Sequence, residues 1–154
     1  MTASGVDLKG QLQADMKTAL KAGDKKKLGV IRLMIAAIKL REIDGRSQLD
    51  DLAVIAVLDK MVKQRRDSAG QFRAAGRIDL ADVEEYEIGV IQEYLPKPLS
   101  PDEILRMIKT AVEESGADSV KELGKVMGLL KPMMQGRADL GLVSQEVKKF
   151  LSAR

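Results

Sequence analysis

The chain has 154 residues, of which 45% are hydrophobic, 32% charged and 3% aromatic, and it contains no Cys, His or Trp. The absence of Cys and His excludes disulfides, thiolate or imidazole metal sites and every catalytic site built on a thiol or an imidazole. The apolar fraction is sufficient for the core of one domain or of two small ones. No apolar run reaches the roughly 18 residues of a membrane span, and the first residues lack a secretory signal pattern. We therefore expect a cytoplasmic protein with no membrane association.

The formal net charge of +3 conceals a strong segmentation along the chain. Residues 17–77 carry fifteen Lys and Arg against seven Asp and Glu, and residues 78–118 carry three against eleven. Residues 119–154 are basic again, with seven against three. The basic segments are therefore available to a polyanion, unless the acidic segment is their intramolecular partner.

Apolar residues recur at helical spacing almost throughout, which predicts an all-α protein. Before residue 95 we expect four helices: residues 7–21, residues 25–43 with Asp24 as cap, a third from residues 50–51 to Gly76, and a fourth from Asp79. A turn is expected at residues 44–46, from its composition. A basic third helix next to an acidic fourth predicts antiparallel neighbours in a bundle.

Three of the four prolines lie between Leu95 and Pro101, where no helix can continue. We predict a Pro-rich linker at 96–101, between an N-terminal four-helix domain (1–95) and a C-terminal three-helix domain (102–154). Ser100 with Glu103 predicts a capping box at the first helix of the second domain. Residues 119 and 122 repeat that spacing for a helix ending near Pro132, and Asp139 is placed to cap the last helix.

Few catalytic arrangements remain. Ser68 could pair with Lys60 or Lys63, but no Gly-rich nucleophile turn accompanies it. Gly124-Lys125 lacks the second Gly and the Ser or Thr of a phosphate-binding loop, and Gly124 with Gly128 is explained more simply by close approach of a neighbouring helix than by ligand contact. Mg²⁺ could bind the acidic fourth helix, although a solvated face is the simpler interpretation; its carboxylates are Asp82, Glu84, Glu85 and Glu87. We expect no catalytic residues, no cofactor and no metal.

The densest basic cluster lies on the predicted third helix and just beyond it: Lys60, Lys63, Arg65, Arg66, Arg73 and Arg77. Positions 66, 73 and 77 are spaced to share one helix face. This cluster could bind phosphates, or its arginines could pair with the acidic fourth helix, and the sequence leaves the two open. The chain has only four aromatic residues, and two of them lie on predicted core faces. We therefore do not expect stacking on unpaired bases, and any RNA would be recognised through its backbone and shape.

Five sequence blocks, taken in order, resemble the YqeY family: Lys60–Ser68, Gly76–Leu80, Glu93–Pro96, Gly124–Gly128 and Gly136–Asp139. The resemblance covers essentially the whole chain and implies a four-helix part followed by a three-helix part. The family is in turn similar to the C-terminal tail of the B subunit of the bacterial glutamine-dependent aspartyl/glutamyl-tRNA amidotransferase, a tail that helps to hold tRNA. Residues 124–127, 131 and 136–139 match the closing pattern of that tail.

The resemblance implies a tRNA-interacting helical module without a complete active site of its own. Its expected RNA contacts are Gly124, Lys125, Lys131, Gly136 and Arg137, and a secondary basic face comprises Lys63, Arg65, Arg66, Arg73 and Arg77. Asp139 is expected to be structural. The family also implies a second possibility, an accessory role in carbon–nitrogen ligation with glutamine as amido-N-donor, alongside amidotransferase or aminoacyl-tRNA synthetase proteins.

A third possibility is a protein–protein adaptor whose Met-rich C-terminal surface docks a partner helix. The methionines concerned are Met107, Met127, Met133 and Met134, and the simpler interpretation is that they fill the core.

Overall fold

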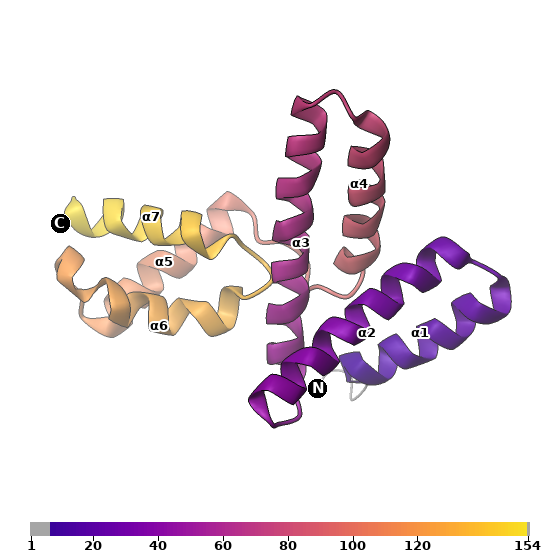
Figure 1. The fold of residues 1–154 in the computed structure, drawn as a ribbon. Helices are drawn as coiled ribbons and strands as arrows, with labels where there is room; N and C mark the ends of the chain where they lie inside the picture. Colours follow the sequence, from indigo (N-terminus) through magenta and orange to yellow (C-terminus); the bar gives the residue numbers. More distant parts are fainter. Residues whose placement is uncertain (1–6, 154) are drawn as a thin grey trace. The chain divides into compact units, whose positions relative to one another are not determined.

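A computed structural model describes residues 7–153, and every regular element in that range is helical (Figure 1). The predicted all-α class is therefore confirmed. None of the described helices is long and apolar enough to cross a membrane. The elements, in chain order, are α1 (Leu8–Ala22), α2 (Lys25–Gly45), α3 (Asp51–Ala74), α4 (Ile78–Gln92), α5 (Pro101–Ser115), the short 3₁₀ helix η1 (Val120–Glu122), α6 (Leu123–Met134) and α7 (Leu140–Ser152).

The chain divides between Leu95 and Pro96 into two compact units, the N-terminal unit (1–95) and the C-terminal unit (96–154). Each unit has its own hydrophobic core. The largest fully buried side chains of the N-terminal unit are Leu12, Ile31, Met34, Leu58 and Ile91, and those of the C-terminal unit are Ile108, Leu130, Met134 and Leu151. Each unit therefore buries the apolar stripes of its own helices.

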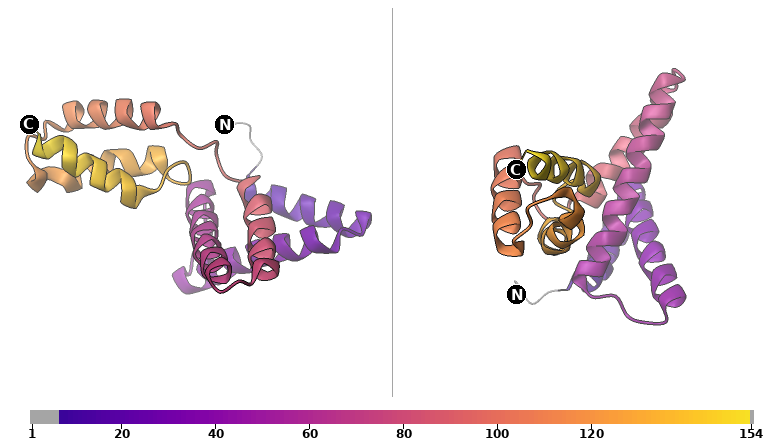
Figure 2. Two further views of the ribbon diagram at one scale, coloured as in Figure 1. Left: turned by 90° about the horizontal axis from the view of Figure 1, so that it is seen from above. Right: turned by 90° about the vertical axis from the view of Figure 1, so that its left-hand side faces the viewer.

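The N-terminal unit consists of two helical hairpins, α1 with α2 and α3 with α4 (Figures 1 and 2). Asp24 caps α2 as predicted, by accepting a hydrogen bond from the Lys27 N–H. The turn predicted at residues 44–46 is wrong in its start, because α2 continues to Gly45 and only Arg46 takes the left-handed conformation, with φ 52°. Gly76, with φ 76°, makes the turn between α3 and α4.

The C-terminal unit contains α5, η1, α6 and α7. The predicted capping box is present: the Ser100 hydroxyl accepts from the Glu103 N–H at 3.1 Å, and the Glu103 carboxylate accepts from the Ser100 N–H at 3.0 Å. The repeat of that spacing at Ser119 makes no side-chain cap; a 3₁₀ turn precedes α6 instead. Pro132 lies inside α6, which ends two residues later at Met134, close to the predicted end near Pro132.

Candidate nucleic-acid interface

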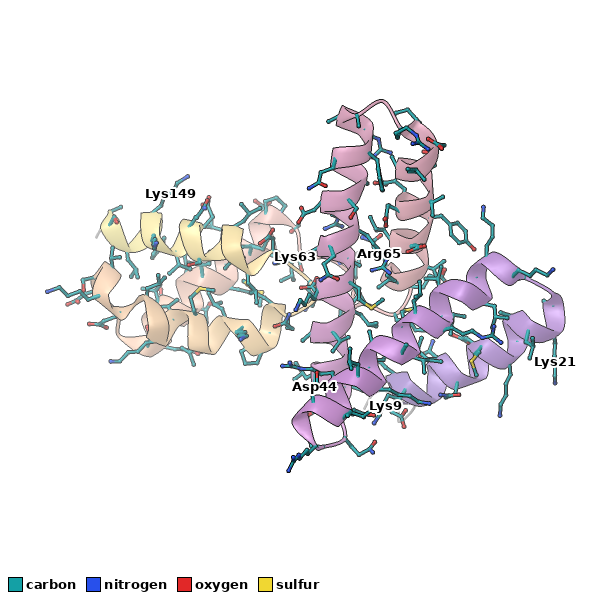
Figure 3. The ribbon with its side chains drawn as sticks, viewed as in Figure 1. Lys9, Lys21, Asp44, Lys63, Arg65 and Lys149 are labelled. Atoms are coloured by element: carbon teal, nitrogen blue, oxygen red, sulfur yellow. The ribbon has the colours of Figure 1, made fainter. Side chains whose placement is uncertain are left out.

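The arginines of α3 are held largely by the acidic residues of α4. Arg65 Nε donates to Glu87 Oε1 at 2.8 Å, with only 16% and 20% of the two side chains exposed, and Arg65 Nη1 donates to the Met61 carbonyl. Arg73 Nη1 lies 3.3 Å from Glu85 Oε1 in a more exposed pair. In Figure 3 Arg65 lies between α3 and α4, and Lys63 lies on the opposite side of α3. Of the two interpretations of this cluster, the structure supports ion pairing for Arg65 and Arg73.

Arg77 does not share a helix face with Arg66 and Arg73, because α3 ends at Ala74. It precedes α4, and its guanidinium pairs with Asp79, two residues along the chain, at 3.1 Å. The secondary basic face predicted from spacing is therefore broken at the end of α3. Arg66 remains exposed on α3, and Lys63 is also exposed.

The outward face of α6 has a different character. Gly124, Lys125, Gly128, Lys131 and Pro132 are all exposed and lie opposite the buried stripe of the same helix, Val126, Leu130 and Met134. A Cβ atom built at Gly124 or Gly128 meets no atom within 4 Å. The expectation that these glycines admit a neighbouring helix is therefore wrong within the described residues. We call this exposed strip of helix backbone at Gly124, Gly128 and Pro132 the α6 ridge.

Two lysines flank the α6 ridge. Lys125 and Lys131 are exposed, and neither forms an ion pair with any of residues 7–153. This contrasts with Arg65 and Arg73, whose charge is balanced by α4. The two lysines therefore present positive charge to solvent at the point where the helix backbone is least covered.

Pro132 affects the same ridge. Because proline has no backbone N–H, it cannot donate the usual helical hydrogen bond to the carbonyl of the residue four positions earlier, Gly128. The ring of Pro132 takes the place of that donor, so α6 has one helical hydrogen bond fewer at this ridge.

The remaining two predicted RNA contacts, Gly136 and Arg137, lie in the turn before α7. Gly136 adopts φ 78°, which favours glycine. Arg137 Nε donates to the Lys97 carbonyl at 3.1 Å, and the Arg137 carbonyl accepts from the Leu99 N–H at 2.9 Å. Arg137 thus joins the Pro-rich segment to the turn before α7 within the C-terminal unit, a structural contact that its sequence context did not reveal.

Asp139 has the predicted structural role, since its carboxylate accepts from the N–H groups of Gly141 and Leu142 at the start of α7. The four C-terminal methionines do not form a common surface: Met134 is fully buried, Met107 and Met127 pack against the core, and only Met133 is exposed. The simpler interpretation of these methionines as core residues therefore holds for three of them.

Two long-range polar contacts in the N-terminal unit were missed by sequence reasoning. The Tyr94 hydroxyl donates to Asp15 Oδ2 at 2.5 Å, and Lys9 Nζ donates to Glu42 Oε2 at 2.6 Å. Burial and the contact with Asp15 raise the pKa of Tyr94, and Lys9 lowers the pKa of Glu42. Because the partners are 79 and 33 residues apart in the sequence, no local spacing pattern predicts these contacts. In residues 7–153 no three acidic side chains come together as a metal site.

A comparison with protein families matches residues 9–151 to the family described as Yqey-like protein. The chain belongs to this family. The resemblance read from the five sequence blocks is thereby confirmed, and family membership applies to both units.

Several fungal relatives carry the name "Altered inheritance of mitochondria protein 41, mitochondrial". The relative from Pyrenophora tritici-repentis is 31% identical over 94% of this chain and 81% of its own length. The relative from Meyerozyma guilliermondii is 43% identical over 54% of this chain, and that match spans 44% of its length. The relative from Saccharomyces cerevisiae (strain YJM789) is 31% identical over 76% of this chain and 66% of its length. The match thus spans about half of some relatives and most of others.

These names contradict the expected cytoplasmic location, because the relatives are named as mitochondrial proteins. The expectation rested on the absence of a recognisable signal in the first residues, which is a weak criterion. The names state no substrate, partner or reaction.

Proposed function

We propose that this chain binds tRNA through the α6 ridge, with Lys125 and Lys131 contacting phosphates. The observation that carries the proposal is the exposure of these two lysines beside two exposed glycines, at which a built Cβ meets no atom within 4 Å. The family resemblance to a tRNA-holding tail supports the choice of ligand. Arg137 donates to the Lys97 carbonyl and has a structural role in the turn before α7, so it is not one of the primary contacts that we propose.

Phosphate recognition explains why lysines and glycines are useful together. A lysine neutralises a phosphate and releases its counterions, and a helix without side chains at two successive turns lets the nucleic-acid backbone approach closely. The ridge therefore suits an RNA backbone better than a base edge.

Base stacking has little support in this chain. Tyr94 is buried, Phe72 and Phe150 are half-buried, and Lys26 Nζ lies over one face of the Tyr86 ring, 4.9 Å from its centroid. Stacking on unpaired bases requires an open aromatic face. We therefore expect recognition of tRNA by backbone and shape.

The test is the double variant Lys125→Ala/Lys131→Ala, compared with Lys148→Ala/Lys149→Ala. Both variants lose two positive charges from the C-terminal unit, and Lys149 projects from α7 away from α6 in the view of Figure 3. The α6 variant should weaken tRNA binding by about tenfold or more at moderate salt and lower the log–log salt slope by roughly 1.4 to 1.8, for two lost phosphate contacts.

The α7 variant should bind nearly as the parent does, apart from a small loss from its lower net charge. Equal losses of tRNA affinity in the two variants would show that tRNA is attracted only by the net charge of the protein and not by the α6 ridge. Unchanged binding in the α6 variant would show that the ridge is not the tRNA site.

A further inference from the structure

A groove between α2 and α3 in the N-terminal unit is unrelated to the α6 ridge. It encloses about 590 Å³, and its lining is mostly apolar and small: Ala37, Leu40, Leu49, Ala53, Ala56, Val57 and Met61, with Arg41, Asp44, Lys60 and Gln64 at its edges. Alanines at three positions of the lining leave space that larger side chains of the same helices would fill. The groove is therefore a place where another molecule's side chains can be received.

Large apolar side chains are exposed on α2, one of the two helices that line this groove. Leu40 is 60% exposed, and Leu33 and Ile43 are 46% and 71% exposed. Positions 33, 40 and 43 lie seven and three residues apart, so they fall on neighbouring lines of one side of the helix. Isolated exposed apolar residues are common, but Leu40 lines the groove and two further large apolar side chains are exposed on the same helix, which marks an interaction surface.

The two walls of the groove carry positive charge. Arg41 is on α2 and Lys60 is on α3, both are exposed, and neither forms an ion pair with any residue of the described part of the chain. Asp44 is the one carboxylate of the lining, and it lies near the end of α2 (Figure 3). An occupant complementary to this groove has apolar anchors at its centre and negative charge along its two sides.

We infer that the groove docks an amphipathic helix of a partner protein that carries Asp and Glu on both sides of an apolar stripe. Anchors at positions i, i+3 or i+4, and i+7 of such a helix would enter the space above Ala37, Ala53 and Ala56. Its carboxylates would meet Arg41 and Lys60. An apolar floor without an exposed aromatic ring favours a protein over a nucleic acid, because a nucleic acid has no aliphatic side chains to bury.

The probe for this inference is a fluorescein-labelled helical peptide of about 15 residues, ~22 Å long, with Leu at the anchor positions and Glu at the flanking ones. Binding is followed by fluorescence anisotropy and by methyl NMR of the full chain. We expect saturable binding, with shifts concentrated at the methyl groups of Ala37, Ala56, Val57 and Met61. A peptide with Lys in place of Glu should bind at least about tenfold more weakly, because like charges then meet.

Two variants separate the apolar from the charged contribution. Leu40→Ser should weaken binding of the Glu peptide, whereas Leu20→Ser on α1, where Leu20 is 59% exposed, should not. Arg41→Glu/Lys60→Glu should reverse the preference between the Glu and Lys peptides. All four positions are exposed, so the variants should fold, which the unperturbed core methyl signals would show.

Equal binding of the two peptides, equal effects of Leu40→Ser and Leu20→Ser, or shifts outside the groove would overturn the inference. So would self-association of the chain that Leu40→Ser abolishes, because the occupant would then be a second copy. The Lys125→Ala/Lys131→Ala variant should bind the Glu peptide unchanged, so failure of the tRNA proposal and failure of this one are distinguishable.

Discussion

Arg65 Nε donates to Glu87 Oε1 at 2.8 Å, and this half-buried pair joins α3 to α4. This cation–carboxylate contact of the basic cluster is therefore internal to the N-terminal unit. It leaves the basic segment of residues 17–77 less available to a polyanion than its charge indicates. The exposed lysines of α6 are the better candidates for phosphate contacts.

The Arg65–Glu87 pair should contribute measurably to stability. Glu87→Gln should lower the free energy of unfolding by about 1 to 2 kcal/mol, because a charge-assisted hydrogen bond with limited solvent access is weakened. A double-mutant cycle on the exposed pair Arg73–Glu85 should give about 0.5 kcal/mol or less. Urea unfolding measures both. Glu87→Gln should leave tRNA affinity unchanged; a loss as large as that of the α6 double variant would place the RNA site on α3 instead.

Gly128→Ala should change stability and binding in opposite directions. A Cβ at this exposed helical position meets no atom within 4 Å, so alanine should stabilise the chain by about 0.5 to 1 kcal/mol through its better helix propensity. The added methyl group should nevertheless weaken tRNA binding, because it lies between Lys125 and Lys131 and keeps the tRNA backbone farther from the helix.

The control for this variant is Gly70→Ala on α3, another glycine with open space around it. It should stabilise the chain to a similar extent and leave tRNA binding unchanged. Thermal unfolding and a binding titration on the same samples provide both readouts. Tighter or unaltered tRNA binding by Gly128→Ala would contradict close approach at the ridge.

Tyr94 should make the chain less stable at alkaline pH. Burial first, and the hydrogen bond to Asp15 second, raise its pKa above the ordinary value of 10.0. Above about pH 10 the unfolded chain therefore loses a proton that the folded chain keeps, and the free energy of unfolding falls by up to about 1.4 kcal/mol per pH unit. Below about pH 10 this contribution is fully present.

Tyr94→Phe should remove this alkaline slope and cost about 1 kcal/mol near neutral pH, because Asp15 loses its donor. The measurement is urea unfolding between about pH 8 and 11, in a Tyr86→Phe background so that one tyrosine remains to titrate. If the tyrosinate absorbance of the native protein rose near pH 10, as it does for free tyrosine, Tyr94 would be accessible and the predicted slope would be absent.

The capping box of α5 should stabilise the chain more at neutral pH than at acidic pH. Ser100→Ala should cost about 1 kcal/mol, because the Glu103 N–H loses its acceptor. The backbone N–H of Ser100, and then its hydroxyl, lower the pKa of Glu103. The resulting stabilisation is present above about pH 4.5 and is lost as pH falls through the lower pKa of the folded state. Glu103→Gln should remove this acid dependence in thermal unfolding scans; an unchanged acid slope would show that the box does not titrate.

Local sequence patterns predicted much of the fold. The spacing of apolar residues predicted the helices. The capping residues Asp24, Ser100 and Asp139 act as predicted, because each caps its helix through partners within three residues. The end of α6 was predicted near Pro132 and lies two residues beyond it, at Met134.

The candidate site was less predictable. Whether an arginine of α3 pairs with α4 depends on how the two helices rotate against each other, and the charge count alone left that open. The contact of Arg137 with Lys97 joins positions 40 residues apart, so a motif match gave no warning of it. The exposed face of α6 became visible only once its buried stripe was known.

The most direct test of the central claim is tRNA binding by the purified full chain across a salt series, with a structured RNA of similar length that is not a tRNA as control. The account predicts tighter binding of tRNA than of the control, and a log–log slope of at least roughly 1.4, corresponding to two or more phosphates. No binding at low salt, or equal binding of both RNAs, would contradict the assignment of the α6 ridge as a tRNA site.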